Sequence, residues 1–268
     1  MTDEAEEHNL EEIYRLNQRG GRTLSVTDLM DAGTIDPDTA ALCWIAVEQG
    51  ESFLAGAVPG GAGKTTLMGS LLAFLPPGEE IVTTATPEIS ERAARGKYRA
   101  PVCLLAHEIG SGPWHAYIWG EDARRFFRAA HQDGYRCVSC LHADNPPQVR
   151  ETAESCEVPQ EDMQQVGMQI FMWLGGSRMS PTRRVNSLHL RLDDELEKVV
   201  DYDTNADEHN IVLGGKELWP ALADRYCAQA EELEESWDRR RRWLAELQRE
   251  GVRDFARVRH AILECEVT

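Results

Sequence analysis

A glycine-rich segment in the first quarter of the chain carries the residue types best suited to binding phosphate. It reads Pro59-Gly60-Gly61-Ala62-Gly63-Lys64-Thr65-Thr66, between a short apolar run at 52–58 and a helical pattern at 65–75. Glycines let successive backbone N–H groups turn inward around an anion, and the following helix directs the positive end of its dipole at it. Lys64 is expected to reach the outer phosphates and the Thr65 hydroxyl to hold Mg²⁺. The segment therefore predicts a site for ATP and Mg²⁺.

One position departs from the usual phosphate-loop pattern G-x-x-x-x-G-K-[ST]. The pattern has glycine where this chain has Val58. The alternative interpretation is a glycine-rich turn with a solvated lysine. The coincidence of strand, loop and helix favours the phosphate loop.

Short apolar runs separated by helical patterns must position this loop. Strands are predicted at 52–58, 80–84, 102–106, 116–119, 135–141 and 185–192, and helices at 65–75, 124–130, 160–174, 216–248 and 252–264. This alternation predicts an α/β fold with a mostly parallel sheet covered on both faces. We divide the chain into an acidic flexible tail (1–22), a helical lead-in (23–50), an α/β core (51–215) and a C-terminal helical subdomain (216–268).

Composition excludes several classes of protein. The 268 residues are 42% hydrophobic, enough for a large core, and 46 Asp and Glu against 28 Lys and Arg give a net charge of −18. Such a charge argues against broad nucleic-acid binding. Only four of the 28 basic residues are lysines. This acidic, arginine-rich bias suits either a salt-adapted cytoplasm or a GC-rich genome that favours arginine codons together with an ordinary acidic tail, and the sequence does not choose between them. An acidic N-terminus, seven scattered cysteines and the lack of a long apolar run predict a cytoplasmic protein with reduced thiols.

Further motifs resemble those of the type II and type IV secretion ATPases. They are Leu75-Pro76-Pro77 with Thr86-Pro87-Glu88 (the aspartate box), Gly120-Glu121 (Walker B), Leu141-His142-Ala143-Asp144 (the histidine box) and the closing stretch 247–258. The resemblance extends from about Leu24 to the C-terminus and is greatest to the archaeal pilus, archaellum and tight-adherence motors. It implies a RecA-like P-loop NTPase core, a homo-oligomeric ring such as a hexamer, and a membrane platform protein as partner.

The resemblance also implies roles for three side chains. Glu121 would orient Mg²⁺ or a water molecule, His142 would sense the γ-phosphate or contact a neighbouring subunit, and Glu88 is the candidate carboxylate of the aspartate box. Without the resemblance, Glu121 would be interpreted as a surface glutamate in a turn and His142 as a structural histidine.

Departures from the family pattern leave two functions open. The acidic residues before Thr86 are replaced by Thr84-Ala85, and the arginine-rich helix before Walker B is replaced by the glycine-rich 106–113. Nucleotide binding is therefore better supported than hydrolysis. The first hypothesis is an ATPase that couples hydrolysis to pilus assembly or secretion at the inner face of a membrane. The alternative is a nucleotide-binding regulatory or assembly partner with weak or no hydrolysis; a DNA translocase is disfavoured by the acidic charge.

Two other motifs are predicted to be structural. Cys137-Val138-Ser139-Cys140 lies within an expected strand, where small buried residues are common and a redox or zinc site lacks its usual context. The run Arg239-Arg240-Arg241-Arg242 follows a glutamate-rich stretch and is interpreted as a solvated helix face.

Overall fold

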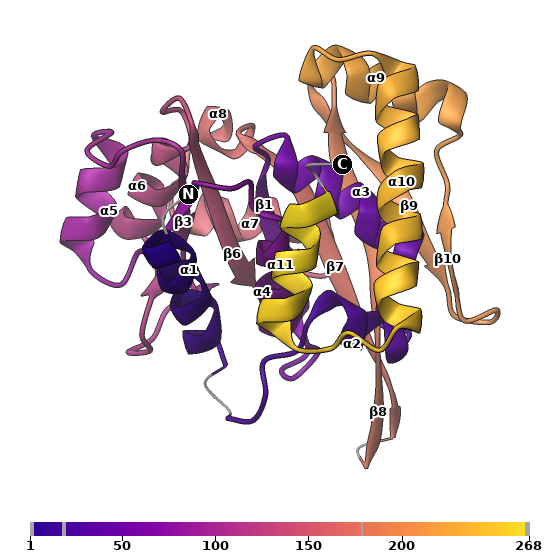
Figure 1. The fold of residues 1–268 in the computed structure, drawn as a ribbon. Coiled ribbons are helices and arrows are strands. Elements are labelled where there is room, and N and C mark those ends of the chain that lie inside the picture. The colour runs from indigo at the N-terminus through magenta and orange to yellow at the C-terminus, as the bar shows by residue number, and fades with distance from the viewer. Residues whose placement is uncertain (1–2, 18–19, 178, 266–268) are drawn as a thin grey trace.

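The computed structural model describes residues 3–17, 20–177 and 179–265, which form a mixed α/β fold (Figure 1). Its helices are α1 (Asp3–Arg15), α2 (Val26–Asp31), α3 (Pro37–Glu48), α4 (Lys64–Leu71), the 3-10 turn η1 (Leu72–Phe74), α5 (Pro87–Ala94), α6 (Glu121–Ala129), α7 (Pro146–Ser155), α8 (Gln160–Met163), α9 (Gly215–Tyr226), α10 (Ala230–Arg249) and α11 (Phe255–Cys265). Its strands are β1 (Ser52–Gly56), β2 (Glu80–Thr83), β3 (Val102–Leu105), β4 (Glu108–Ile109), β5 (Tyr117–Ile118), β6 (Tyr135–Leu141), β7 (Val166–Ser177), β8 (Ser180–Leu192), β9 (Glu195–Asp203) and β10 (Glu208–Ile211).

The ten strands form a single, mostly parallel sheet in the order β10-β9-β8-β7-β1-β6-β3-β2. From β7 to β2 every neighbouring pair is parallel, whereas β8, β9 and β10 add antiparallel strands beyond β7. The short β4 and β5 pair with each other, and β4 also joins the end of β6. The predicted α/β class and mostly parallel sheet agree with this arrangement.

Alternating side chains of the parallel strands face two separate layers of helices. Phe53 and Ala55 of β1 pack into a cluster with α3, α4, α10 and α11, whereas Leu54 between them packs into a second cluster with α6 and α7. Successive residues of a strand point to opposite faces, so strands buried on both sides are rich in apolar residues at consecutive positions. This is why Phe53, Leu54 and Ala55 of β1 are all apolar.

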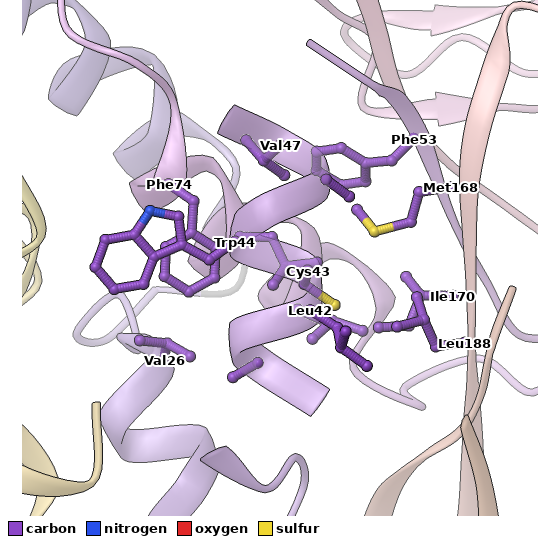
Figure 2. Close-up of a cluster of buried hydrophobic side chains, with 14 of the residues drawn as sticks. Val26, Leu42, Cys43, Trp44, Val47, Phe53, Phe74, Met168, Ile170 and Leu188 are labelled. Atoms are coloured by element: carbon purple, nitrogen blue, oxygen red, sulfur yellow. The ribbon is translucent and has the colours of Figure 1, made fainter. Parts of the chain in front are cut away.

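The larger cluster is centred on helix α3, which is buried along most of its length (Figure 2). Trp44 stacks on Phe74 with ring centroids 5.1 Å apart and planes 7° apart. Toward the sheet, Leu42 and Cys43 lie near Ile170 and Leu188 of β7 and β8. The predicted helical lead-in is therefore a central helix of the core.

The N-terminal segment is not the flexible tail that its acidic composition predicted. Residues 3–15 form α1, whose Ile13 is buried in the larger cluster. The Asn9 side chain completes the edge strand β2: its Nδ2 donates to the Glu79 carbonyl at 2.8 Å, and its Oδ1 accepts from the Ile81 N–H at 2.8 Å. Glu6 pairs with Arg259 of α11. The entropy cost of ordering this segment is offset by its contacts with β2 and α11, which the composition does not reveal.

Three expectations for the second half of the chain are also corrected. Residues 160–174 were predicted as one buried helix, but only the four residues of α8 are helical and the apolar run that follows is β7. The C-terminal helices do not form a separate subdomain, because Leu218, Leu244 and Val258 belong to the same buried cluster as α3 and β1. The single helix predicted at 216–248 is divided into α9 and α10.

The arginine run on α10 is partly structural rather than wholly solvated. Arg240 is 4% exposed, pairs with Glu48 and lies over the Trp44 ring. Arg241 and Arg242 pair with Asp238 on the same helix. Arg240 therefore anchors α10 to α3, whereas the ion pairs of Arg241 and Arg242 with Asp238 stay within α10.

Candidate functional site

The glycine-rich segment forms a loop that connects the end of β1 to the start of α4. Gly61 and Gly63 have φ angles of +83° and +99°, a region that L side chains rarely adopt. Gly63 caps α4, so the first N–H groups of that helix point toward the loop without intrahelical acceptors. A Cβ on Gly60 would meet nothing within 4 Å. The loop is therefore an open, glycine-dependent cradle at a helix N-terminus, as an anion site requires.

Lys64 lies within this cradle rather than in solvent. Its side chain is 7% exposed, and its Nζ donates to the Ala57 carbonyl at 3.1 Å. A turn with a solvated lysine, the alternative at the sequence level, does not describe this arrangement. The remaining predicted binding residues, Pro59, Ala62, Thr65 and Thr66, lie on the same loop or in the first turn of α4.

Val58, the departure from the glycine pattern, is held from both sides by the end of β6. Its N–H donates to Asp144 Oδ1 at 2.7 Å, and its carbonyl accepts a hydrogen bond from His142 Nδ1 at 3.0 Å. Val58 itself does not have a positive φ angle. A β-branched side chain is therefore compatible with the backbone at this position, and the valine does not disturb the loop.

His142 also connects the loop to a carboxylate that the sequence analysis did not select. Its Nε2 lies 3.1 Å from Oε1 of Glu108, whose side chain is only 12% exposed. The two ring nitrogens thus face two different oxygen atoms, one of the Val58 carbonyl and one of the Glu108 carboxylate. Glu108 lies on β4, three residues after the end of β3 and beside the end of β6. The predicted placement of His142 at the loop edge is what the structure shows.

The pKa of the buried Cys140 thiol responds to the charges of both Glu108 and Lys64. Burial raises the pKa of Cys140 to about 12, the Lys64 ammonium opposes that rise, and the Glu108 carboxylate adds to it. Both charges therefore act on one side chain of β6, below the loop. A carboxylate and an ammonium at this edge are the groups that bind phosphate and orient a metal ion or water.

Glu121, the predicted Walker B carboxylate, forms its ion pairs with its own helix and not with the phosphate loop. It begins α6, is exposed, and pairs with Arg124 and Arg125, which lowers its pKa. Arg124 in turn binds the Cys156 carbonyl at the C-terminal end of α7. Helix α7 starts just after His142 and Asp144, which contact the loop. The C-terminal end of α7, where Arg124 binds, is about 15 Å from that start, because the helix has ten residues. The strand before Glu121 is β5, which is not one of the central parallel strands.

Glu88 lies on the loop edge of the sheet but far along it. It is exposed at the start of α5, and a hydrogen bond from Thr86 lowers its pKa. Strands β6 and β3 separate β2 from β1, a span of about 14 Å. Thr84, where the family pattern has acidic residues, is buried and donates to the Leu105 carbonyl.

Comparison with known proteins gives relatives without an assigned role. No family model matches the chain. It is 28% identical over 223 residues to the uncharacterized protein MJ1287 of Methanocaldococcus jannaschii, covering 75% of this chain and 77% of that protein. It is 29% identical over 185 residues to the uncharacterized protein MJ0900 of the same organism, covering 62% of this chain and 33% of the other.

Among solved structures, the chain is similar to the VirB11 ATPase of the Brucella suis type IV secretion system in complex with sulphate. The TM-score is 0.42 at 16% identity, over 60% of this chain and 53% of that one. Similarity at this level carries no argument of its own, so the function must be argued from the residues of the site.

Three residues of the site were missed at the sequence level: Glu108, Asp144 and Arg183. Glu108 carried a usable signal, because it closely follows the apolar run 102–106, where a parallel strand ends. Asp144 stood next to the selected His142 but had no assigned role. Arg183 Nε donates to the Gly61 carbonyl at 2.8 Å from β8, a contact across 122 residues that no local pattern announces.

Acid is expected to destabilise the protein through two buried histidines. Burial lowers the pKa of His107 and of His189 from 6.5 to about 4. Because the folded-state pKa lies below the unfolded one, the stabilisation is complete above pH ~6.5 and is lost as the pH falls toward 4. Between pH 7.5 and pH 5 each histidine should remove about 2 kcal/mol from the free energy of unfolding. Urea unfolding at both pH values measures this.

A variant separates this effect from general acid sensitivity. His189 faces Lys198 and Asp201 on β9 and lies edge-on to the Phe171 ring. His189→Leu removes one titrating group, so it should shrink the difference between the two pH values by about 2 kcal/mol. An unchanged difference would contradict the assignment.

Proposed function

We propose that this protein is an ATP-binding ATPase of the secretion and pilus-assembly class, built on a RecA-like P-loop core. The observation that carries the proposal is the buried Lys64 in a glycine cradle at the N-terminus of α4, with Glu108 and His142 on the adjoining strand ends. The parallel strand order β7-β1-β6-β3-β2, with the loop after a central strand, supports the core assignment. The class comes from the sequence resemblance alone.

ATP and Mg²⁺ fit the residues present. The glycine cradle and Lys64 suit the phosphates, while the Thr65 hydroxyl and the Glu108 carboxylate are the hard oxygen ligands that Mg²⁺ prefers. When bound, the ion would neutralise charge on the phosphates. In the proposed reaction Glu108 orients the attacking water, and Lys64 stabilises charge on the outer phosphates. His142 positions Glu108 and the loop together.

The alternative function is a nucleotide-binding regulatory or assembly partner with little turnover. The arrangement after β2 favours it. The Thr84 hydroxyl donates a hydrogen bond to the Leu105 carbonyl, and Glu88 is exposed about 14 Å along the sheet edge from β1. No second carboxylate therefore reaches the loop from that strand. Under this alternative, ATP binding changes the loop without being followed by rapid hydrolysis.

A ring and a membrane platform belong to the same proposal. The secretion class acts as oligomeric rings, such as hexamers, on the inner face of a membrane through a platform protein, and the resemblance extends those partners to this chain. In the described part of the chain, no helix is both long and apolar enough to cross a bilayer. Docking to a platform protein is the form of membrane association we propose.

Lys64→Ala is the test of nucleotide binding. Because the ammonium contributes a charge-assisted hydrogen bond to the phosphates, we expect the Kd for Mg-ATP, measured calorimetrically, to rise at least 10-fold. Lys216→Ala, at an exposed position of α9, is the matched control and should leave the Kd unchanged. A wild-type protein that does not bind ATP would overturn the proposal. Binding without turnover by the wild type would select the regulatory alternative.

A further inference from the structure

The β7–β8 hairpin extends past the end of β1 and forms a wall beside the phosphate loop. The last residue of β1, Gly56, pairs with Phe171, whereas the two hairpin strands stay paired as far as Ser177 and Ser180. Figure 1 shows the end of this hairpin projecting from the body of the molecule. The stretch from Met172 onward therefore lies beyond the carboxyl edge of the central strands, where ligands of parallel sheets bind.

Two adjacent arginines on this hairpin have different surroundings. Arg184 pairs with Asp207 through two nitrogens, at 2.7 and 3.0 Å, and also donates to the Ala32 carbonyl. Arg183 points to the other side of the strand, as alternation requires. There its Nε donates to the Gly61 carbonyl at 2.8 Å, and its Cδ lies 3.3 Å from where a Cβ on Gly63 would be.

The charge of Arg183 is not neutralised within the described residues. None of the carboxylates placed by the structure forms an ion pair with it, whereas its neighbour Arg184 is ion-paired. Its Nε is committed to the loop backbone, which leaves the two terminal nitrogens of the guanidinium fork as further donors. Arg183 is thus a half-buried arginine beside the loop, without a carboxylate partner among the described residues, in a chain of net charge −18. A bound anion would neutralise its charge.

We propose that Arg183 is a phosphate-binding residue, supplied to the loop from β8 of the same chain, and that it makes the site selective for nucleotides with a polyphosphate. The inference rests on the proposed nucleotide site and specifies how that site recognises its ligand. The Nε–Gly61 hydrogen bond fixes the plane of the guanidinium, and the fork then presents two parallel donors to phosphate oxygens. Lys64 acts on the same phosphates as a point charge from the opposite, helical side of the loop.

Arg183→Gln tests this role through the ligands it affects. A charge-assisted bond to phosphate is worth about 10- to 100-fold in affinity. We therefore expect the calorimetric Kd to rise by that factor for Mg-ATP and for inorganic tripolyphosphate, which has no base or sugar. The affinity for AMP should change little, because a single phosphate fills less of the loop. Arg183→Lys keeps the charge without the fork and should fall between the variant and the wild type.

Arg184→Gln is the matched control, since it removes one charge from the neighbouring residue of the same strand. It should leave the affinity for both polyphosphates close to that of the wild type. Equal weakening of polyphosphate binding by Arg184→Gln would mean that the positive charge of the hairpin as a whole, and not Arg183 itself, attracts the phosphates. Equal loss of AMP and ATP affinity in Arg183→Gln would mean that Arg183 only maintains the shape of the loop. Either result, or an unchanged Arg183→Gln, overturns the inference while Lys64→Ala still reports on the nucleotide site. A wild type that binds no nucleotide overturns both.

Discussion

Glu108→Gln is expected to lower ATP turnover about 10²- to 10⁴-fold while leaving the Kd for Mg-ATP within a few-fold of the wild type. The substitution keeps the size of the side chain and removes the charge that we propose orients the attacking water beside the loop. The Glu108 side chain is 12% exposed and its Oε1 lies 3.1 Å from His142 Nε2, a contact in which glutamine would place a neutral amide. Phosphate release at saturating Mg-ATP measures the turnover, and a binding assay in parallel separates catalysis from affinity.

The control is Glu121→Gln, because Glu121 is the carboxylate that the sequence motif selects. Its partners are Arg124 and Arg125 on its own helix, and those exposed pairs contribute little to stability. Turnover in this variant should remain within about twofold of the wild type, since the ion pairs of Glu121 in the described part of the chain are with its own helix. If Glu121→Gln abolished turnover and Glu108→Gln did not, the assignment from geometry would be wrong and the motif would be right.

The phosphate loop could be predicted because its signal is entirely local. Glycines that need positive φ, a lysine and a helix start follow one another within eight residues, and the structure places them as the spacing requires. Local backbone chemistry determines such a segment, so a single sequence is sufficient for it. His142 is different: its place just after β6, a neighbour of β1, could be predicted, but its role came from the family resemblance.

The carboxylate of the site could not be chosen by local pattern, because two segments offered one. Gly120-Glu121 follows a short apolar run and matches a known motif, whereas Glu108 follows β3 without a motif. The two carboxylates differ in the strand that precedes them. The strand between β6 and β2 in the sheet is β3, which precedes Glu108, and this order is a long-range property of the fold. Strand order depends on crossovers of many residues, and neither periodicity nor composition encodes it directly.

Apolar runs of intermediate length explain why a helix was wrongly predicted where β7 lies. The segment 166–174 is apolar on both faces because β7 is buried between β1 and β8, and a buried strand and a buried helix look alike at that length. In α1 the reverse holds: few apolar residues predicted disorder, but Asn9 and Glu6 make polar contacts with β2 and α11 that order it. In both cases tertiary partners decided the outcome.

Arg136→Met is expected to reduce the free energy of unfolding by about 3–5 kcal/mol. Arg136 of β6 and Glu79 are 4% and 3% exposed, with Arg136 Nε 2.5 Å and Nη2 2.7 Å from the two carboxylate oxygens. The guanidinium also donates to the Val47 carbonyl at the end of α3. Removing it would leave a buried carboxylate and a buried carbonyl without their donor, and both penalties act together. Urea unfolding at pH 7.5 measures the loss.

Two comparisons show whether burial, rather than the ion pair as such, sets this cost. Lys198→Met breaks the Lys198–Asp201 pair, in which both side chains are 47% exposed, and should cost no more than about 1 kcal/mol. Adding Glu79→Leu to Arg136→Met removes the stranded carboxylate, so it should recover a large part of the lost stability. If the double variant were as unstable as Arg136→Met, the cost would come from lost packing around β6 and the Val47 carbonyl. The Glu79 charge would then not be what Arg136 is needed to neutralise.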